Sequence, residues 1–362
     1  MDFNKHFGSI SDPRDVRRIH HQMSDIIGLS ILGTISGCEG YEDIEEFGKT
    51  RETWLRQYLG LPGGIPSHDT IERLFESMNP REFSLCFTLW VKDTFELQGD
   101  QFLHIDGKSN RRSGDTESGK KMLHTVSVFS GKNHLSLAQF KVDEKSNEIT
   151  AIEPVLEYVD VEDKVITIDA MGCQKSIAQT ISEKGGYYIL AVKDNQKSLH
   201  DEIQSAFKST PIADSHTTVE KDHGRMEERS CSVITDLRFV DESINWTALC
   251  CIICIVSKRT IRNKTSIETR YFISNLKQTA PFLLSAVRSH WGIENCLHWV
   301  LDMLFHEDYC RKRKDNAAEN FNLIRKTALN VLRSYKGDKK SLRRRRLNAA
   351  WDMQYLEKLM KT

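Results

Sequence analysis

Two short apolar segments, each ending in an aspartate, constrain the fold of this chain more than any other feature. Residues 102–105 precede Asp106 and Gly107, and residues 165–168 precede Asp169 and a turn of small residues. Apolar runs of this length are typical of buried strands that end in a turn. A single Asp-Gly would also suit a simple hairpin. Two such segments predict neighbouring parallel strands whose carboxylates meet at one sheet edge, where ligands collect in open α/β sheets.

The surrounding segments predict a mixed α/β core. We expect two hairpin strands, two helices and a further strand at residues 121–130, 134–142, 147–159, 173–184 and 187–192. Short right-handed crossovers would then place the strand ending in Asp169 beside the strand ending in Asp106. This is the element order of a ribonuclease-H-like fold. Paired carboxylates at such an edge can bind divalent cations such as Mg²⁺ through their oxygen atoms.

The regions around this core are predicted from their apolar spacing and composition. Residues 1–98 are expected to form a small all-helical N-terminal domain, either a DNA-binding helix-turn-helix or a structural cap on the core. The core comprises residues 99–208 and a helical second part, 278–335. Residues 209–277 form a β-rich insertion, with strands expected at 219–233, 246–258 and 266–276. Residues 336–362 are expected to form a basic linker and a C-terminal helix.

The charge of the chain is unevenly distributed. The formal net charge is +0, yet residues 310–346 contain 14 Lys and Arg residues against 3 acidic ones. This basic segment suits a polyanionic partner, although a solvated helical surface would explain it equally well. The N-terminal sequence shows no secretory signal, and nine cysteines without a regular framework are typical of a reducing compartment. We therefore expect a cytoplasmic protein, associated with the nucleoid if its partner is DNA.

Phosphodiester cleavage with two metal ions usually requires a third carboxylate. The candidates after the insertion are Glu294, Asp302, Glu307, Asp308 and Glu319. The spacing of residues 289–302 predicts an amphipathic helix on which Glu294 shares one face with His298 and Asp302. A single glutamate on such a helix is more often a solvated charge than a ligand. Periodicity alone therefore leaves the third acid open.

Five stretches carry a resemblance to a known family: HIDGK, VITIDAMGCQ, HGRMEER, RYFISNL and HWGIENCLHWVLDMLF. In this order they resemble the DDE transposases of bacterial insertion sequences, and more narrowly the ISAs-type group and the H-repeat-associated proteins of Rhs elements. The resemblance covers almost the whole chain. It implies that Asp106, Asp169 and Glu294 form a catalytic triad on a ribonuclease-H-like fold. It also implies two Mg²⁺ or Mn²⁺ ions per active site, with Asp106 shared between them.

The same resemblance suggests where DNA is bound. Broader relatives carry a Y-x2-R-x3-E-x6-K pattern, whose positions hold Val287, His290 and Leu301 here. The phosphate-clamping role could therefore pass to neighbouring side chains. The DNA-binding candidates are Lys108, Arg111, Arg112, His223, Arg225, Arg288, His290, His298, Arg311, Lys312 and Arg313, together with the basic run at 343–346. Trp291 and Trp299 are expected to belong to the core rather than to stack on bases.

The predicted function is transposition. The resemblance implies hydrolysis at the ends of an insertion sequence, followed by attack of the freed 3′-hydroxyl on target double-stranded DNA. A homodimer is expected, because two ends must be paired. One alternative is a ribonuclease-H-like nuclease without strand transfer, and another is a catalytically silent DNA-binding or recombination-associated protein.

Overall fold

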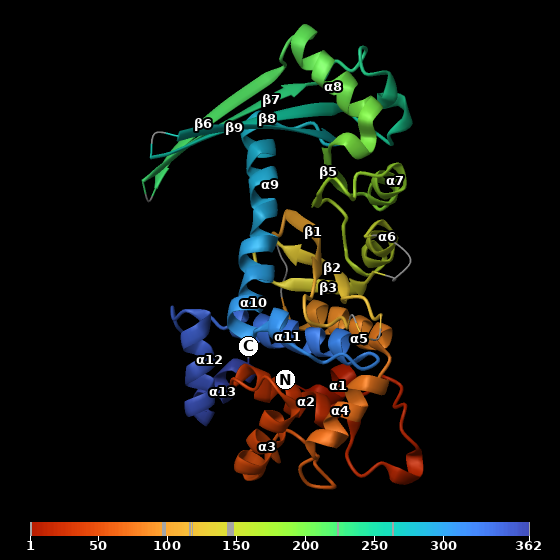
Figure 1. Cartoon of the computed structure of the whole chain (residues 1–362), viewed down its shortest axis with the longest axis vertical. Coiled ribbons are helices and arrows are strands. Elements are labelled where there is room, and N and C mark those ends of the chain that lie inside the picture. Colours follow the sequence, from red (N-terminus) through yellow and green to blue (C-terminus); the bar gives the residue numbers. More distant parts are fainter. Residues whose placement is uncertain are drawn as a thin grey trace.

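The computed structural model describes residues 2–95, 99–115, 117, 119–142, 148–222, 224–262 and 264–361. One mixed nine-stranded sheet, in the order β3-β2-β1-β4-β5-β9-β8-β7-β6, runs through the molecule (Figure 1). Its strands are β1 (Phe102–Ser109), β2 (His124–Ser130), β3 (Ser136–Lys141), β4 (Val165–Ile168), β5 (Tyr187–Val192), β6 (Asp214–Asp222), β7 (Arg225–Ile234), β8 (Cys251–Ile261) and β9 (Lys264–Ser274).

The first five strands confirm the predicted ribonuclease-H-like fold class. β2 is antiparallel to both β1 and β3, whereas β1, β4 and β5 are parallel. Ile105 of β1 is paired in register with Ile168 of β4. The next residues are Asp106, which lies within β1, and Asp169, which directly follows β4, so the register brings both acids to the same level. The predicted end of the first strand at Asp106 is wrong, because β1 continues to Ser109 by pairing with β2.

The β-rich insertion continues the same sheet. β9 pairs antiparallel with β5, and β6 to β9 form an antiparallel meander that projects as an arm (Figure 1). The single strand expected at residues 219–233 is wrong, because the chain turns back between β6 and β7 at a glycine with positive φ, Gly224. Most residues of β6 are exposed, since this edge strand extends beyond the helices that cover the rest of the sheet.

Helices cover both faces of the core sheet. They are α1 (Phe3–Phe7), α2 (Met23–Ile35), α3 (Tyr41–Leu55), α4 (His68–Ser77), α5 (Pro80–Thr94), α6 (Ile149–Tyr158), α7 (Lys175–Glu183), α8 (Lys197–Ser209), α9 (Ala280–Gly292), α10 (Trp299–Phe305), α11 (Ala317–Ser334), α12 (Leu342–Trp351) and α13 (Met353–Met360). None of the helices in the described part of the chain is long and apolar enough to cross a membrane.

The alternation of side chains along β4 separates the two faces. Val165 packs with the apolar side chains of α9, whereas Ile166 and Ile168 belong to the larger core that contains α6 and α7. Thr167 faces α9 as well, through a hydrogen bond to His290. By the same alternation, Asp169 lies on the sheet face that α9 covers. Asp106 of β1 lies on this face as well.

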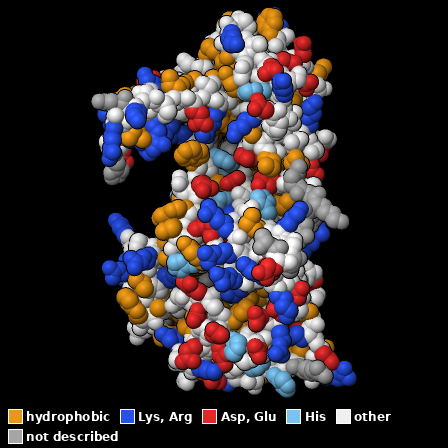
Figure 2. Space-filling model, viewed as in Figure 1, with side chains coloured by type: hydrophobic (Ala, Val, Ile, Leu, Met, Phe, Trp, Pro, Cys, Tyr) orange, Lys and Arg blue, Asp and Glu red, His pale blue; other side chains and the backbone are white. Residues whose placement is uncertain are grey.

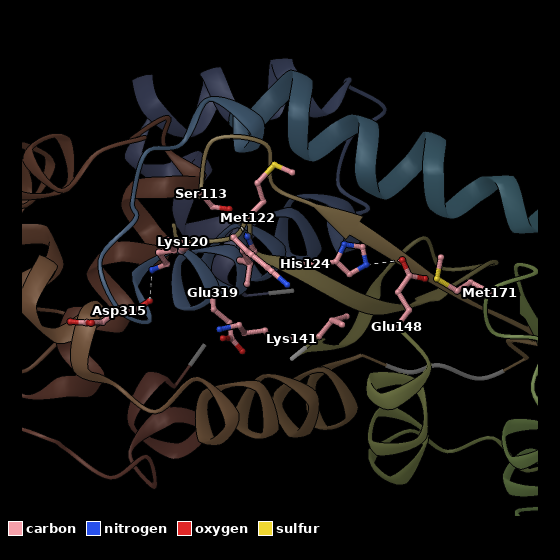
Figure 3. Close-up of a pocket in the computed structure, with 13 residues that line it drawn as sticks. Ser113, Lys120, Met122, His124, Lys141, Glu148, Met171, Asp315 and Glu319 are labelled. Carbon is pink, nitrogen blue, oxygen red and sulfur yellow. Dashed lines mark hydrogen bonds and ion pairs between the residues drawn. The ribbon is translucent and has the colours of Figure 1, made fainter. Parts of the chain in front are cut away.

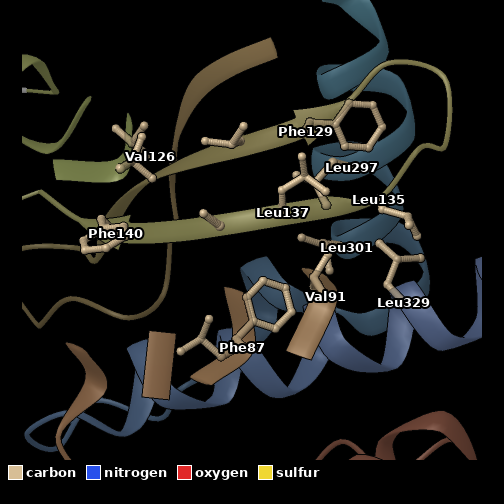
Figure 4. Close-up of a cluster of buried hydrophobic side chains, with 14 of the residues drawn as sticks. Phe87, Val91, Val126, Phe129, Leu135, Leu137, Phe140, Leu297, Leu301 and Leu329 are labelled. Carbon is tan, nitrogen blue, oxygen red and sulfur yellow. The ribbon is translucent and has the colours of Figure 1, made fainter. Parts of the chain in front are cut away.

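The buried helix α11 joins the N-terminal helices to the sheet. Asn320 donates hydrogen bonds to the carbonyls of Phe75 and Met78, and Asn330 exchanges two hydrogen bonds with the backbone of Ser136 in β3. Figure 4 shows α5, β2, β3, α10 and α11 sharing one apolar cluster, with these side chains labelled: Phe87, Val91, Val126, Phe129, Leu135, Leu137, Phe140, Leu297, Leu301 and Leu329. Packing of this kind is what a structural cap requires.

The basic run at residues 343–346 lies within α12 and not in a linker. Arg345 and Arg346 are buried, and their guanidinium groups donate to the carbonyls of Leu332 and Thr34. The predicted DNA contact of these two arginines is therefore wrong, because their donors satisfy carbonyl groups inside the fold. Arg343 and Arg344 are exposed.

Candidate active site

Asp106 within β1 and Asp169 just after β4 are crowded and largely buried. Burial, opposed by His298 and assisted by the charges of Asp169 and Glu148, raises the pKa of Asp106 to about 6. Burial and Glu148 also raise the pKa of Asp169. Asp169 Oδ1 accepts hydrogen bonds from the backbone N–H groups of Met171 and Gly172 at 3.0 and 3.3 Å, which fixes the carboxylate after the strand. Crowded carboxylates of this kind favour a bound cation.

A π-helical turn brings the third acid to this pair. Helix α9 ends at Gly292, and the chain passes through a π turn, Ile293–His298, before continuing as α10. Isolated π turns of this type often occur at functional sites. The turn presents Glu294 and the buried His298 toward β1. His298 Nδ1 lies 3.5 Å from Asp106 Oδ2 and 3.4 Å from Glu294 Oε2.

The three predicted acids line one cavity of about 360 Å³, whose basic and aromatic lining residues are Lys193, Arg270, Phe272, His290 and Trp291. Ligand atoms of Asp106, Glu294 and His298 all lie within 4.8 Å of one another. The hydrogen bond from His298 lowers the pKa of Glu294, although burial opposes this. Carboxylate oxygens are the ligands that Mg²⁺ and Mn²⁺ prefer, so the donor set fits the predicted cofactor.

Comparison with known families decides the assignment. Residues 94–331 match the family model described as "Transposase DDE domain", and residues 4–91 match "DDE_Tnp_1-associated". The chain belongs to the DDE transposase family. Both matches agree with the resemblance found in the sequence, and the DDE domain spans the whole sheet together with α6 to α10 and most of α11.

Members of this DDE transposase family in Escherichia coli are similar over nearly the full length of the chain. "H repeat-associated putative transposase YhhI" of strain K12 is 40% identical over 98% of this chain and 97% of that protein. "Putative transposase YncI" of strain O157:H7 is 38% identical over 97% and 92%. "Inactive transposase YbfQ" of strain K12 is 46% identical over only 19% of this chain and 83% of that protein. Among solved structures, a piggyBac transposase synaptic complex with hairpin DNA aligns with a TM-score of 0.45 and 12% identity, over 99% of this chain and 78% of that chain.

Lys108 does not lie where the sequence suggested. Its side chain is 11% exposed, and Nζ lies 2.8 Å from Asp302 Oδ1 and 3.2 Å from both Glu307 Oε2 and Asp308 Oδ1. Burial lowers the pKa of this amine, but the three carboxylates outweigh burial and raise it above the usual value. The predicted phosphate contact is wrong for this residue, because its charge is already neutralised. Asp302, a candidate third acid, forms an ion pair with this lysine.

The two predicted DNA-binding residues on α9, His290 and Arg288, also bind other side chains of the protein. His290 Nδ1 forms a 2.7 Å hydrogen bond with Thr167, and burial lowers its pKa to about 4, so the imidazole is uncharged at neutral pH. The predicted phosphate contact of His290 is therefore wrong, because an uncharged imidazole has no positive charge to attract a phosphate. Arg288 forms a bidentate ion pair with Glu220 of β6, with distances of 2.6 and 2.9 Å, and so holds α9 against the arm.

The remaining basic candidates differ in exposure. Arg111 is 81% exposed and pairs with Asp308, while the exposed Arg112 lies over the ring of Tyr309. Lys312, predicted to contact DNA, is half-buried: its Nζ atom lies over the rings of Tyr41 and Phe321 and donates a hydrogen bond to the carbonyl of Glu39. Arg311 and Arg313 are exposed, and Arg225 is partly exposed beside Glu227. His223 lies outside the described residues.

A basic groove adjoins the active-site cavity. It lies between the arm and α9, has a volume of about 550 Å³, and is lined by the six basic residues Arg225, Arg229, Lys258, Arg259, Arg270 and Arg288, with the three acids Glu227, Glu228 and Glu268. Figure 2 shows the hollow below the arm, with basic side chains on the underside of the arm and on the body opposite. Trp291 lines both groove and cavity. Trp291 and Trp299 are each 58% exposed, so their predicted place in the core is wrong.

Sequence reasoning missed one acid beside the site. Glu148, at the start of α6, faces the backbone of Gly107, where a Cβ atom would overlap its carboxylate. His124 Nε2 forms a 2.6 Å hydrogen bond with Glu148 (Figure 3). His124 Nδ1 forms another of 2.6 Å with Ser109. No motif marks Glu148, and the search for a third acid covered only the residues after the insertion.

Proposed function

We propose that this DDE transposase family member cleaves the ends of an insertion sequence and joins the 3′-hydroxyl to target DNA. The observation that carries the proposal is the placement of Asp106, Asp169 and Glu294 on one cavity, on two neighbouring parallel strands and on the facing π turn. Asp106 lies between the other two acids in the proposed arrangement, and it would contribute to both metal sites. Divalent cations bound there would activate the attacking hydroxyl and neutralise charge on the scissile phosphate.

The protein groups around the cavity have separate proposed roles. Asp169 and Glu294 each hold one side of the metal site, and the backbone donors to Asp169 keep its carboxylate in place. The adjoining basic groove would hold the DNA backbone, because phosphate contacts fix the register of a duplex without reading its sequence. Double-stranded DNA is thus the proposed partner, bound by a homodimer in the cytoplasm.

The proposal is tested by cleavage of a labelled duplex that carries the element's terminal repeats, with Mg²⁺ or Mn²⁺ and unlabelled target DNA. We expect metal-dependent nicking at the repeat ends and a joined product. Glu294→Gln should lose at least about 100-fold in cleavage rate, because an anchored charge at the reacting phosphate is worth several kcal/mol. The matched variant Asp302→Asn should lose far less, since Asp302 pairs with Lys108, and Glu307 and Asp308 keep that lysine in place. Nicking without joining would instead indicate a nuclease, and binding without nicking a silent protein.

The groove makes a separate prediction about DNA affinity. Arg259 lines the groove and is 49% exposed, whereas Arg238, 81% exposed, lies on the insertion outside it. Arg259→Ala should weaken duplex binding about equally for all sequences and reduce the salt dependence of binding by about one phosphate contact. Arg238→Ala should leave both unchanged. Fluorescence anisotropy at several salt concentrations measures both quantities, and equal effects of the two substitutions would exclude the groove as the DNA interface.

A further inference from the structure

The π turn supplies a nitrogen atom as well as a carboxylate to the active site. His298 is 4% exposed, and its Nδ1 atom faces the carboxylate oxygens of Asp106 and Glu294. Together the three residues are the one group of metal-ligand type found among the described residues, with all three ligand atoms within 4.8 Å of one another. Asp169 lines the same cavity but is not a member of this group.

The distances fit ligands of one ion as well as the long hydrogen bond between His298 Nδ1 and Glu294. The separations of 3.5 and 3.4 Å from Nδ1 to the two carboxylates exceed the about 2.7–3.2 Å of a good N–H···O bond. Two atoms that each lie about 2.0–2.2 Å from a shared metal ion are themselves about 3–3.5 Å apart. Two other histidines nearby differ: His104 and His290 form hydrogen bonds of 2.6 and 2.7 Å with Thr167.

The other ring nitrogen of His298, Nε2, determines whether Nδ1 can present its lone pair to a metal ion. Nε2 of His298 is buried and has no hydrogen-bond partner among the residues that the structure describes. The proton of a neutral imidazole can therefore reside on Nε2, so that Nδ1 presents its lone pair to the two carboxylates. Neutral imidazole is the form in which histidine binds metals.

We propose that His298 is a direct ligand of the metal ion held by Asp106 and Glu294, and that it makes this position selective for Mn²⁺ over Mg²⁺. The inference rests on the proposed function, because it concerns the same metal site. Carboxylate oxygens suit Mg²⁺ and Mn²⁺ alike, whereas imidazole nitrogen favours transition-metal ions. The π turn is what allows the selectivity, since it directs Glu294 and His298, four residues apart, toward the same carboxylate of β1.

Mn²⁺ binding to the full-length protein without DNA tests the inference. Continuous-wave electron paramagnetic resonance measures affinity, competition with Mg²⁺ measures selectivity, and pulsed measurements detect a ¹⁴N nucleus bonded to Mn²⁺. The wild type should show ¹⁴N coupling. His298→Gln should lose it and bind Mn²⁺ about 10- to 100-fold more weakly, a loss of the size seen when metal sites lose a supporting group. Its Mg²⁺ affinity should change by less than a few-fold.

His290→Gln is the matched control, because His290 lines the same cavity but bonds to Thr167 rather than to a carboxylate. It should retain both the coupling and the affinity. Bound Mn²⁺ without ¹⁴N coupling in the wild type, or coupling that survives in His298→Gln, would overturn the inference and leave the proposed transposase function standing. Absence of any Mn²⁺ or Mg²⁺ binding by the wild type would overturn both. The wild-type spectrum decides the first point even if a variant does not fold.

Discussion

Asp106→Asn is expected to abolish metal-dependent DNA cleavage and, in the same molecule, to stabilise the metal-free fold at neutral pH. Asp106 is the acid shared by both proposed metal sites, so its loss removes several kcal/mol of charge stabilisation. Because each 1.36 kcal/mol is a factor of ten, cleavage should fall by at least about 10³-fold. The duplex cleavage assay with Mg²⁺ or Mn²⁺ measures this effect.

The gain in stability follows from the direction of the pKa shift. Burial raises the pKa of Asp106 from 3.8 to about 6, so the folded state keeps the proton more readily than the unfolded state. The free energy of unfolding of the metal-free wild type should therefore decrease as the pH rises from about 4 to about 6, by about 1–3 kcal/mol. Asparagine has no such charge to bury. Asp106→Asn should match the wild type at pH 4 and exceed it by about this amount at pH 7.5.

Chemical denaturation in the presence of a chelator at the two pH values checks this result. Glu45→Gln serves as a control of opposite sign, because the ion pair with Lys49 and hydrogen bonds with His68 lower the pKa of Glu45 to about 2. That substitution should reduce stability at neutral pH. If Asp106→Asn also reduced stability at pH 7.5, the Asp106 carboxylate would be fully satisfied within the fold and the site would not require a cation.

The local patterns of the sequence predicted the framework of this site correctly. The apolar runs before Asp106 and Asp169 form strands of eight and four residues that pair in parallel, and the local apolar pattern of each run suffices to predict the strand. The helix carrying Glu294 was also expected from its periodicity. Its π turn was not, because an inserted residue leaves the apolar spacing on either side nearly unchanged.

Long-range pairing explains most of the wrong residue assignments. A basic residue in isolation suggests a solvent-exposed charge, but Arg346 is satisfied by the carbonyl of Thr34, which lies more than 300 positions earlier. The same is true of Lys312, whose amine lies over the ring of Tyr41 and donates to the carbonyl of Glu39, both far earlier in the chain. Exposed Trp291 and Trp299 were misassigned for the opposite reason. A large aromatic side chain predicts burial on average, whereas here Trp291 lines the groove and Trp299 is equally exposed.

Lys108→Met should produce the largest loss of stability among substitutions of basic residues near the site. Lys108 neutralises Asp302, Glu307 and Asp308, and Glu307 is only 1% exposed. Removing one partner of a buried ion pair leaves uncompensated charge and costs about 3–5 kcal/mol. Chemical denaturation at pH 7.5 measures the change. Lys175→Met is the matched control, because Lys175 and its partner Glu242 are more exposed, and it should cost less than about 1 kcal/mol.

The double variant Lys108→Met, Glu307→Gln separates charge from packing. If uncompensated charge causes the loss, removing the buried carboxylate should recover part of it, whereas loss of packing by the lysine stem would not be recovered. The three acids follow the π turn in the chain and Lys108 follows Asp106 by two residues, so this ion cluster joins β1 to the segment that carries Glu294 and His298. Weakening it should therefore also lower metal affinity, although Lys108 touches no proposed ligand. An unchanged metal affinity in a destabilised Lys108→Met protein would mean that the π turn holds its geometry without the cluster.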